Sequence, residues 1–362
     1  MRVLLLLCIL SLASCGPGSG DDTISPEPAA PTALKDLAPF PIGGAINIRQ
    51  ISQDSQLREI ATTQFNSVTS TNDMKMYRIA DTEGQLDFGR ADSTVAFARE
   101  HGMRVFGHAL VWHYALPEYI AEMDREEMEA FLTEYIDTVV THFRGEIDGW
   151  DVVNEVLDTK GGEMRPSPFY NKMGDEYIRL AFRTARAADP EAKLFINDFG
   201  TERDTAKLNA LIDMVDEMRA DGVPIDGIGF QWHQQMGDDT VMVRENLRRA
   251  AATGLLIHVS ELDLIFNTHN DERGGGREDV QAVTDEMLQQ QAERYETLAR
   301  IYREEVPTEQ QYGITFWDFN DRDTWIKGFF EMGDWPTLYD EQLQPKPAYE
   351  GFRRGLDPVA PL

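Results

Sequence analysis

The feature that most constrains the fold is a regular alternation of short apolar runs with longer amphipathic stretches. This alternation is typical of βα units and a parallel sheet. Eight strands, each followed by a helix or loop, are enough to close a barrel. The sequence therefore predicts an α/β fold, a single (β/α)8 barrel of the TIM type. We expect its strands at Ile42–Ile46, Phe65–Ser70, Arg104–Ala109, Gly149–Asn154, Lys193–Asn197, Gly227–Trp232, Leu256–Ser260 and Gly313–Asp318.

The stretches between these runs predict the helices of the barrel. A Gly-rich segment, His269–Asp279, follows the seventh predicted strand. It lacks the following helix and the Lys of a phosphate-binding loop, so we expect a flexible loop there. The helices are expected at Arg90–His101, Arg125–Phe143, Gly174–Ala188, Thr205–Asp221, Val241–Ala252 and Val280–Glu304.

The first fifteen residues resemble a bacterial lipoprotein signal peptide. Arg2 precedes the apolar run Val3–Leu12, and small residues lead to Cys15. The run is shorter than the ~20 residues that span a bilayer. We expect cleavage before Cys15 and its lipidation; the alternative is an ordinary secretory leader. Both cysteines, Cys8 and Cys15, lie in this segment, which predicts a mature body without a disulfide.

Residues 16–37 are rich in Gly, Pro, Ala and Asp, a composition that cannot bury a core and predicts a flexible tether. The barrel domain is then expected at 38–362. The lipoprotein signal implies export and anchoring to the bacterial cell envelope, with the protein facing the periplasm or the cell surface. Gly16 after Cys15 is compatible with sorting to the outer membrane. The lipid anchor is the expected membrane contact, and we expect a monomer.

The formal net charge of −29 bears on the partners of the chain. It comes from 34 basic and 63 acidic side chains in 362 residues. Nucleic acids and anionic membrane surfaces would repel such a protein, so neither is expected as a partner. A neutral polymer would be indifferent to the charge. The 42% hydrophobic content is enough for a sizeable core.

Polar and aromatic side chains collect at the ends of seven consecutive predicted strands. In a βα barrel these ends meet at one face, where chemistry takes place. Packing alone does not account for such a series, so this face is the expected functional site. The residues are Asn72, Lys75, His108, Trp112, His113, Asn154, Glu155, Asn197, Asp198, Gln231, His233, Glu261, Asp263 and Trp317.

Two of these residues, Glu155 and Glu261, are carboxylates that end the fourth and seventh strands. Glu155 alone is also compatible with an acid at a helix N-terminus. A carboxylate that ends a buried strand needs a partner, and Asp263 on the same face adds a like charge. His233 on the neighbouring strand is the candidate that keeps Glu261 ionised. Two carboxylates that face each other across a sugar-sized gap are typical of glycoside hydrolysis.

Histidine and tryptophan residues at the same face have competing interpretations. His108 and His113 lie five residues apart, which is neither the helical spacing nor another pattern of zinc ligands. We therefore expect no metal, and no other cofactor. Trp112, Trp317 and Trp325 are compatible with core packing or with stacking against the apolar face of a sugar.

Nine segments between Phe65 and Phe352 carry a resemblance to glycoside hydrolase family 10, the endo-β-1,4-xylanase family. Their order along the chain also matches that family. The segments are FNSVTSTNDMK, FGHALVWHYALP, WDVVNEV, FYNKMGDEYIRLAF, AKLFINDF, IDGIGFQWHQ, VSELDL, ITFWDFNDRDTW and LYDEQLQPKPAY.

The resemblance implies a retaining hydrolase that cuts β-1,4-xylosidic bonds inside xylan by double displacement. Glu155 resembles the family's general acid/base and Glu261 its nucleophile, with their carboxyl groups about 5–5.5 Å apart. Asn154 would bond the sugar 2-hydroxyl, and His233 and Asp263 would orient and charge-tune the nucleophile. His108, Trp112, Gln231, Lys75 and Asn72 match glycone-side positions, and Trp317 and Trp325 match aromatic walls.

The chain also departs from the family pattern. Thr71 stands where Glu is usual, Met76 where Trp is usual, and Tyr114-Ala115 where Ser-Gln is common. Trp232 replaces a small residue, and Asp318 replaces a Gly. Each lost hydrogen bond to the substrate is worth ~0.5–1.5 kcal/mol, so the departures bear on substrate preference.

Two alternatives to a xylanase remain open at this point. One is a retaining β-glycanase of the same fold that acts on a mixed-linkage or decorated polysaccharide. The other is a surface lipoprotein that binds glycan without cutting it. Relative activities on a panel of xylans and glucans would distinguish a xylanase from the other β-glycanase. Turnover that is lost in Glu261→Ala would exclude the glycan-binding lipoprotein.

Overall fold

The structure, a computed structural model, describes residues 33–357. Eight parallel strands close into a barrel, because β9 pairs with β12 as well as with β7. The fold predicted from the alternation is therefore confirmed. The barrel strands, in their order around it, are β12 (Gln311–Phe316), β1 (Ile42–Ile46), β2 (Ser67–Ser70), β3 (Arg104–Gly107), β5 (Gly149–Asn154), β6 (Lys193–Asp198), β7 (Gly227–Phe230) and β9 (Leu256–Ile265).

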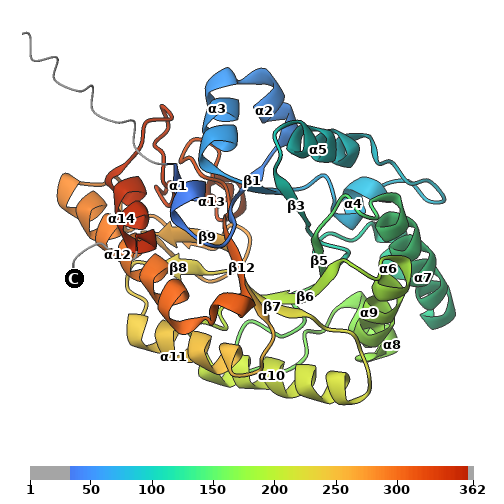
Figure 1. Cartoon of the computed structure of the whole chain (residues 1–362). Helices are drawn as coiled ribbons and strands as arrows, with labels where there is room; N and C mark the ends of the chain where they lie inside the picture. The colour runs from blue at the N-terminus through green and yellow to red at the C-terminus, as the bar shows by residue number, and fades with distance from the viewer. Residues whose placement is uncertain (1–32, 358–362) are drawn as a thin grey trace, which may run out of the picture. The chain divides into compact units, whose positions relative to one another are not determined.

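Helices surround the strands, as Figure 1 shows. Six of the long helices agree with the predicted ones to within a few residues at each end, and two more, Ser55–Gln64 and Pro347–Leu356, were not predicted. The long helices are α3 (Ser55–Gln64), α5 (Gly89–Glu100), α7 (Arg125–His142), α9 (Glu176–Ala188), α10 (Thr205–Ala220), α11 (Thr240–Ala251), α12 (Asp285–Glu305) and α14 (Pro347–Leu356). Among residues 33–357, no helix is both long and apolar enough to cross a membrane.

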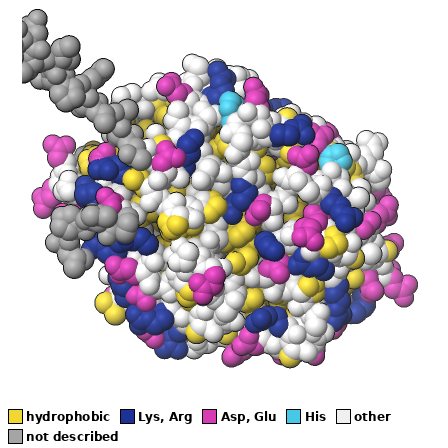
Figure 2. Space-filling model, in the orientation of Figure 1, with side chains coloured by type: hydrophobic (Ala, Val, Ile, Leu, Met, Phe, Trp, Pro, Cys, Tyr) yellow, Lys and Arg dark blue, Asp and Glu magenta, His cyan; other side chains and the backbone are white. Residues whose placement is uncertain are grey.

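Shorter helices and strands lie in the segments that connect these elements. The short helices are α1 (Leu34–Leu37), α2 (Ile48–Gln53), α4 (Met76–Ile79), α6 (Glu118–Glu122), α8 (Pro168–Met173), α13 (Trp325–Phe329) and the 3₁₀ turn η1 (Thr308–Gln310). The short strands are β4 (Val111–Trp112), β8 (His233–Gln235), β10 (Thr268–His269) and β11 (Gly276–Arg277). Figure 2 shows basic and acidic side chains mixed over one face of the molecule.

The expected boundary of the tether at residue 37 is wrong by a few residues. Leu34–Leu37 form α1, and Leu34 is completely buried in the core. The Nζ of Lys35 also donates to the carbonyl of Thr62. These leucines differ from the Gly, Pro and Ala before them because they have apolar surface to bury. The leader, Cys15 and the rest of the expected tether lie outside the described residues and stay predictions.

The seventh strand is longer than predicted. β9 continues from the expected end at Ser260 to Ile265, and every residue after its first is buried. β8 pairs with this extension and sets His233 opposite Asp263. Glu261 therefore lies inside a strand and does not simply follow one.

The Gly-rich segment His269–Asp279 is a paired hairpin, which corrects the expected flexible loop. β10 and β11 are antiparallel, and the backbone N–H groups of Gly274 and Gly276 donate to the carbonyls of Phe329 and Phe330. A Cβ on Gly276 would lie 2.6 Å from the carbonyl oxygen of Phe330. Glycine is thus needed where the hairpin packs against α13.

An aromatic layer fills the barrel just below the site. Phe106, Phe195, His258 and Tyr312 come from four different strands and meet at ring-centroid distances of 4.5–5.9 Å. His108 and Asn197 lie two residues further along the same strands as Phe106 and Phe195. Since alternate residues of a strand point to the same side, the next inward layer is the polar one.

Candidate active site

A cavity of about 1040 Å³ opens at the carboxyl ends of the barrel strands. Nearly all of the site residues expected from the sequence line it. Asn197, Asp198 and Asp263 are the exceptions, because they are fully buried, Asp263 behind His233. The expected residues that line the cavity are Asn72, Lys75, His108, Trp112, Asn154, Glu155, Gln231, His233, Glu261, Trp317 and Trp325.

Glu261 is a buried carboxylate with cationic and amide partners. The Nδ2 of Asn197 donates to its Oε1 at 2.9 Å, and the Nε2 of His233 lies 3.5 Å from its Oε2. Burial alone would raise the pKa of Glu261, but His108, His233 and Lys75 outweigh it and lower that pKa. Glu261 is therefore ionised at neutral pH, as a nucleophile must be.

His233 is held as a cation between two carboxylates. Its Nδ1 donates to Oδ2 of Asp263 at 2.9 Å. Burial would lower the pKa of His233, but Asp263 and Glu261 raise it to about 10. Trp325 Nε1 donates to the same Oδ2 at 2.7 Å and so fixes Asp263 from the other side. The structure thus brings His233, Asp263 and Glu261 together, and their catalytic roles stay predictions.

Glu155 directly follows β5 and has a left-handed backbone, with φ of 58°. Gln231 Nε2 donates to its Oε1 at 3.2 Å. The Nδ1 of His113 lies 3.9 Å from its Oε2, and burial followed by the charge of Arg165 lowers the pKa of His113 to about 4. A neutral His113 adds no positive charge next to Glu155. Backbone strain of this kind is found at functional sites.

One amide connects the surroundings of the two glutamates. Asn197 Nδ2 contacts both Glu261 and the Oδ1 of Asn154, the latter at 3.0 Å. Asn154 Nδ2 in turn donates to Oε1 of Glu155 at 3.5 Å. The sequence placed Asn197 at a strand end but assigned it no role. An amide at the end of an otherwise apolar run was the available signal.

Asp151 is a second residue whose role the sequence analysis missed. It is fully buried in β5, and the Nδ1 of His108 donates to its Oδ2 at 2.8 Å. Burial raises the pKa of Asp151 to about 6 although His108 opposes this. One donor atom each from His108, Asp151 and Glu261 lies within 4.8 Å of the others. The hydrogen bond of His108 to Asp151 and its 4.0 Å contact with Glu261 account for this grouping.

Lys75 lies between Trp112, expected at a glycone-side position, and Trp317, one of the expected aromatic walls. Its Nζ is 4.6 Å from the ring centroid of Trp112 and 5.3 Å from that of Trp317. Burial lowers the pKa of Lys75 to about 8, against the opposing effect of Glu261, Glu155 and Asp318. Trp112 and Trp317 thus border the cavity and are not simply core residues.

The departures from the family pattern fall into two groups. Thr71, Tyr114, Ala115 and Asp318 line the cavity. Met76 and Trp232 are instead buried in the hydrophobic core, so they do not contact a substrate directly. Asp318 has a φ of 56°, where glycine is favoured, and burial raises its pKa to about 8.

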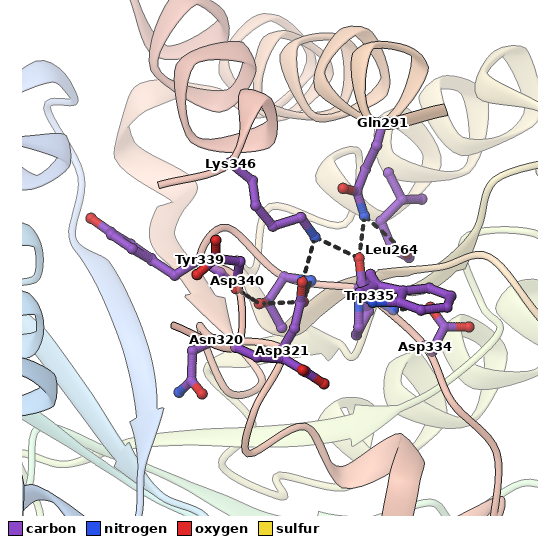
Figure 3. A network of polar contacts seen from close by, with 12 residues as sticks. Leu264, Gln291, Asn320, Asp321, Asp334, Trp335, Tyr339, Asp340 and Lys346 are labelled. Atoms are coloured by element: carbon purple, nitrogen blue, oxygen red, sulfur yellow. Dashed lines mark hydrogen bonds and ion pairs between the residues drawn. The ribbon is translucent and has the colours of Figure 1, made fainter. Parts of the chain in front are cut away.

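A network behind the site fixes the carboxyl end of β9 (Figure 3). Gln291 Nε2 donates to the carbonyls of Leu264 and Trp335. Lys346 Nζ also donates to the carbonyl of Trp335 and pairs with Oδ2 of Asp321 at 2.8 Å. Leu264 directly follows Asp263, so α12 and the segment before α14 hold the strand that carries both acids.

Comparison with known proteins identifies the family of the chain. The family model "Glycosyl hydrolase family 10" matches residues 32–354. The chain is 38% identical over 351 residues to endo-1,4-beta-xylanase A of Cellvibrio japonicus, covering 91% of this chain and 57% of that protein. It is 36% identical over 314 residues to endo-1,4-beta-xylanase B of Thermotoga neapolitana, covering 86% of each.

Solved structures agree with the sequence matches. Xylanase 10C of Cellvibrio japonicus in complex with xylopentaose has a TM-score of 0.84 at 35% identity, covering 90% of this chain and 69% of that one. Native xylanase 10B of Thermotoga maritima has a TM-score of 0.81 at 36% identity, covering 90% and 98%. The chain spans only about half the length of some curated relatives, 57% in the first one above. On the family match and these identities, the chain belongs to glycosyl hydrolase family 10.

Proposed function

We propose that this protein is a retaining endo-β-1,4-xylanase. The observation that carries the proposal is the environment of two cavity-lining glutamates, Glu261 and Glu155. Three cationic or polar neighbours lower the pKa of Glu261, while His113 next to Glu155 is neutral. The ionised Glu261 is thereby prepared to attack an anomeric carbon.

The reaction has two steps. Glu261 attacks the anomeric carbon while Glu155 donates its proton to the leaving oxygen, so the glycosidic C–O bond breaks and a glycosyl ester forms. Water, which loses a proton to Glu155, then cleaves the ester and regenerates both carboxyl groups. The carboxyl groups are predicted to lie about 5–5.5 Å apart, the retaining spacing. Gln231 and Asn154 hold Oε1 of Glu155 through both steps.

The choice of xylan as substrate follows from the relatives. The curated relatives described above are named endo-1,4-beta-xylanases, and a solved relative binds xylopentaose. The site residues that the resemblance implies for the glycone side, such as Lys75 and Trp112, line the cavity of this chain. We propose a neutral xylan or a related β-glycan as the polymer.

Hydrolysis of purified β-1,4-xylan, followed by NMR of the first products, tests this function. We expect the β-anomer to form first. Glu261→Gln should lower turnover by at least about 10³-fold, whereas Glu129→Gln, on the exposed surface of α7, should match the native enzyme. An α-anomer as first product would refute the retaining mechanism, and xylan binding without turnover would favour a glycan-binding lipoprotein.

A decorated or mixed-linkage polysaccharide is the second candidate substrate. Thr71, Ala115 and Asp318 favour it, because all three line the cavity where the family pattern has other residues. Rates on linear and branched xylans and on mixed-linkage glucans decide between the two. A rate on linear xylan below that on the other polymers would favour the second candidate.

We also propose, from the sequence alone, that the protein is exported as a monomer and anchored through lipidated Cys15. Labelled palmitate should be incorporated into the native chain and not into Cys15→Ala. Equal labelling of both would contradict the anchor.

A further inference from the structure

Three side chains connect opposite sides of the cavity mouth. Arg273 Nε donates to the hydroxyl oxygen of Tyr114 at 2.9 Å. The Arg273 guanidinium lies 5.5 Å from the ring centroid of Phe329, and the Tyr114 and Phe329 rings are 5.8 Å apart. All three residues line the cavity. We call this group the Tyr114–Arg273–Phe329 bridge.

The barrel topology places this bridge across the mouth. Tyr114 follows β3 and β4, whereas Arg273 lies in the hairpin after β9. In the closed order β12–β1–β2–β3–β5–β6–β7–β9, strands β3 and β9 are four steps apart in either direction. They are therefore diametrically opposite, and a contact between the loops that follow them has to cross over the barrel end.

Both ends of the bridge lie next to the catalytic groups. Tyr114 follows His113, which lies 3.9 Å from Glu155. Phe329 is one helical turn after Trp325, which bonds Asp263, and their rings are 5.5 Å apart. The bridge therefore crosses the cavity close to the point where a sugar chain would be cut.

The two ends of the bridge differ in how firmly they are held. The Arg273 hairpin is fixed by backbone hydrogen bonds to Phe329 and Phe330, and the ring of His269 stacks on Phe330 at 4.1 Å. Tyr114 is 48% exposed. One hydrogen bond to Arg273 and one ring contact with Phe329 thus join Tyr114 to a fixed platform, a connection weak enough to open and re-form.

The cavity continues on both sides of the bridge. Asn47 and Thr71 line it near β1 and β2, and Thr159 and Phe199 line it near β5 and β6. A polymer that occupies both sides has to pass under the bridge. Resting on the function proposed above, we infer that the closed bridge retains the xylan chain after each cut, so that several bonds are cut in one encounter.

The size distribution of a long, linear, soluble β-1,4-xylan at a low extent of hydrolysis tests this inference. With the native enzyme, full-length polymer and short products should predominate, with few chains of intermediate size. Tyr114→Ala and Arg273→Ala should lower the number of cuts per encounter by about fivefold, the effect of losing an exposed cation–π or hydrogen-bonding contact. Arg277→Ala, in the same hairpin but paired with Asp279, should match the native enzyme.

A binding measurement separates the bridge from the chemistry. In the inactive Glu261→Ala background, adding Arg273→Ala should speed dissociation of long xylan by a similar factor, measured by tryptophan fluorescence. Identical size distributions and dissociation rates in native and bridge variants would overturn the inference but leave the proposed xylanase intact. A native enzyme that neither binds nor cuts xylan would overturn both.

Discussion

His233 lies directly opposite Asp263 in the register of β8 and β9, and the two side chains are joined by a 2.9 Å hydrogen bond. Two residues earlier on β9, Glu261 occupies the other side of the His233 ring at 3.5 Å. A short accessory strand thus positions one imidazolium between two acids of a single barrel strand. The ionised state of the proposed nucleophile depends on this pairing.

We predict that His233→Gln shifts the acid limb of the pH profile of kcat/KM to higher pH. The charge of His233 lowers the pKa of Glu261, so its loss lets that pKa rise and Glu261 becomes protonated, and inactive as a nucleophile, at a higher pH. Loss of a charged hydrogen bond should also lower kcat by about 10–100-fold. His142→Gln, on the outer helix α7, is the control, and an unchanged acid limb in His233→Gln would contradict the prediction.

Trp325→Phe should lower kcat/KM by about tenfold. The substitution keeps an aromatic ring but removes the Nε1 donor that lies 2.7 Å from Asp263. A hydrogen bond to a charged acceptor is worth about 1.5–3 kcal/mol, part of which the remaining partner His233 compensates. Steady-state kinetics on xylo-oligosaccharides measure the effect, and Trp335→Phe, outside the cavity, should retain native kinetics.

Lys346→Ala should lower the free energy of unfolding by about 3–5 kcal/mol, because it leaves the fully buried carboxylate of Asp321 without its cation. Urea or guanidinium unfolding measures this loss. Lys327→Ala, whose ammonium pairs with the surface residue Glu341, should cost about 1 kcal/mol or less. Equal losses in the two variants would show that burial of the ion pair is unimportant.

Asp318→Asn should make the stability of the protein less dependent on pH. Burial raises the pKa of Asp318 from 3.8 to about 8, so the folded state keeps a proton that the unfolded state releases. The contribution of Asp318 to the stability of the native protein therefore falls as the pH rises from 4 to 8. Asparagine avoids this loss and tolerates the positive φ.

The melting temperature of Asp318→Asn should therefore equal that of the native protein near pH 4. Near pH 8 the melting temperature of the variant should be higher than that of the native protein by on the order of 2–4 °C. Asp137→Asn, at an exposed position of α7, provides the control at both pH values. A melting-temperature difference that is the same at pH 4 and pH 8 would argue against titration of Asp318 in the folded state.

The barrel and most of its site could be predicted from the sequence, because short buried strands appear as apolar runs with polar ends. The end of β9 could not. Glu261 and Asp263 interrupt the apolar pattern, and only pairing with β8 shows that the strand continues. The positions of Met76 and Trp232 in the core were likewise hidden, since a motif alignment does not say which way a side chain points.

Contacts between loops were beyond sequence reasoning for a different physical reason. Tyr114 and Arg273 are 159 residues apart, and their meeting depends on how two surface loops fold. The glycines of the hairpin suggested flexibility, although one of them, Gly276, is needed for close backbone packing against Phe330. Amino-acid composition indicates how flexible a segment would be in isolation. It does not show the tertiary contacts that restrict that flexibility in the folded protein.

Asn197 carries no reacting atom, yet its single Nδ2 group contacts both Glu261 and Asn154. The position of Glu261 relative to Asn154 and its neighbour Glu155 consequently depends on a third strand, β6, which carries Asn197. A shift of β6 by a fraction of an ångström would misalign both at once. Evolutionary or engineered changes in the outer helices that press on β6 can therefore tune turnover without touching either acid.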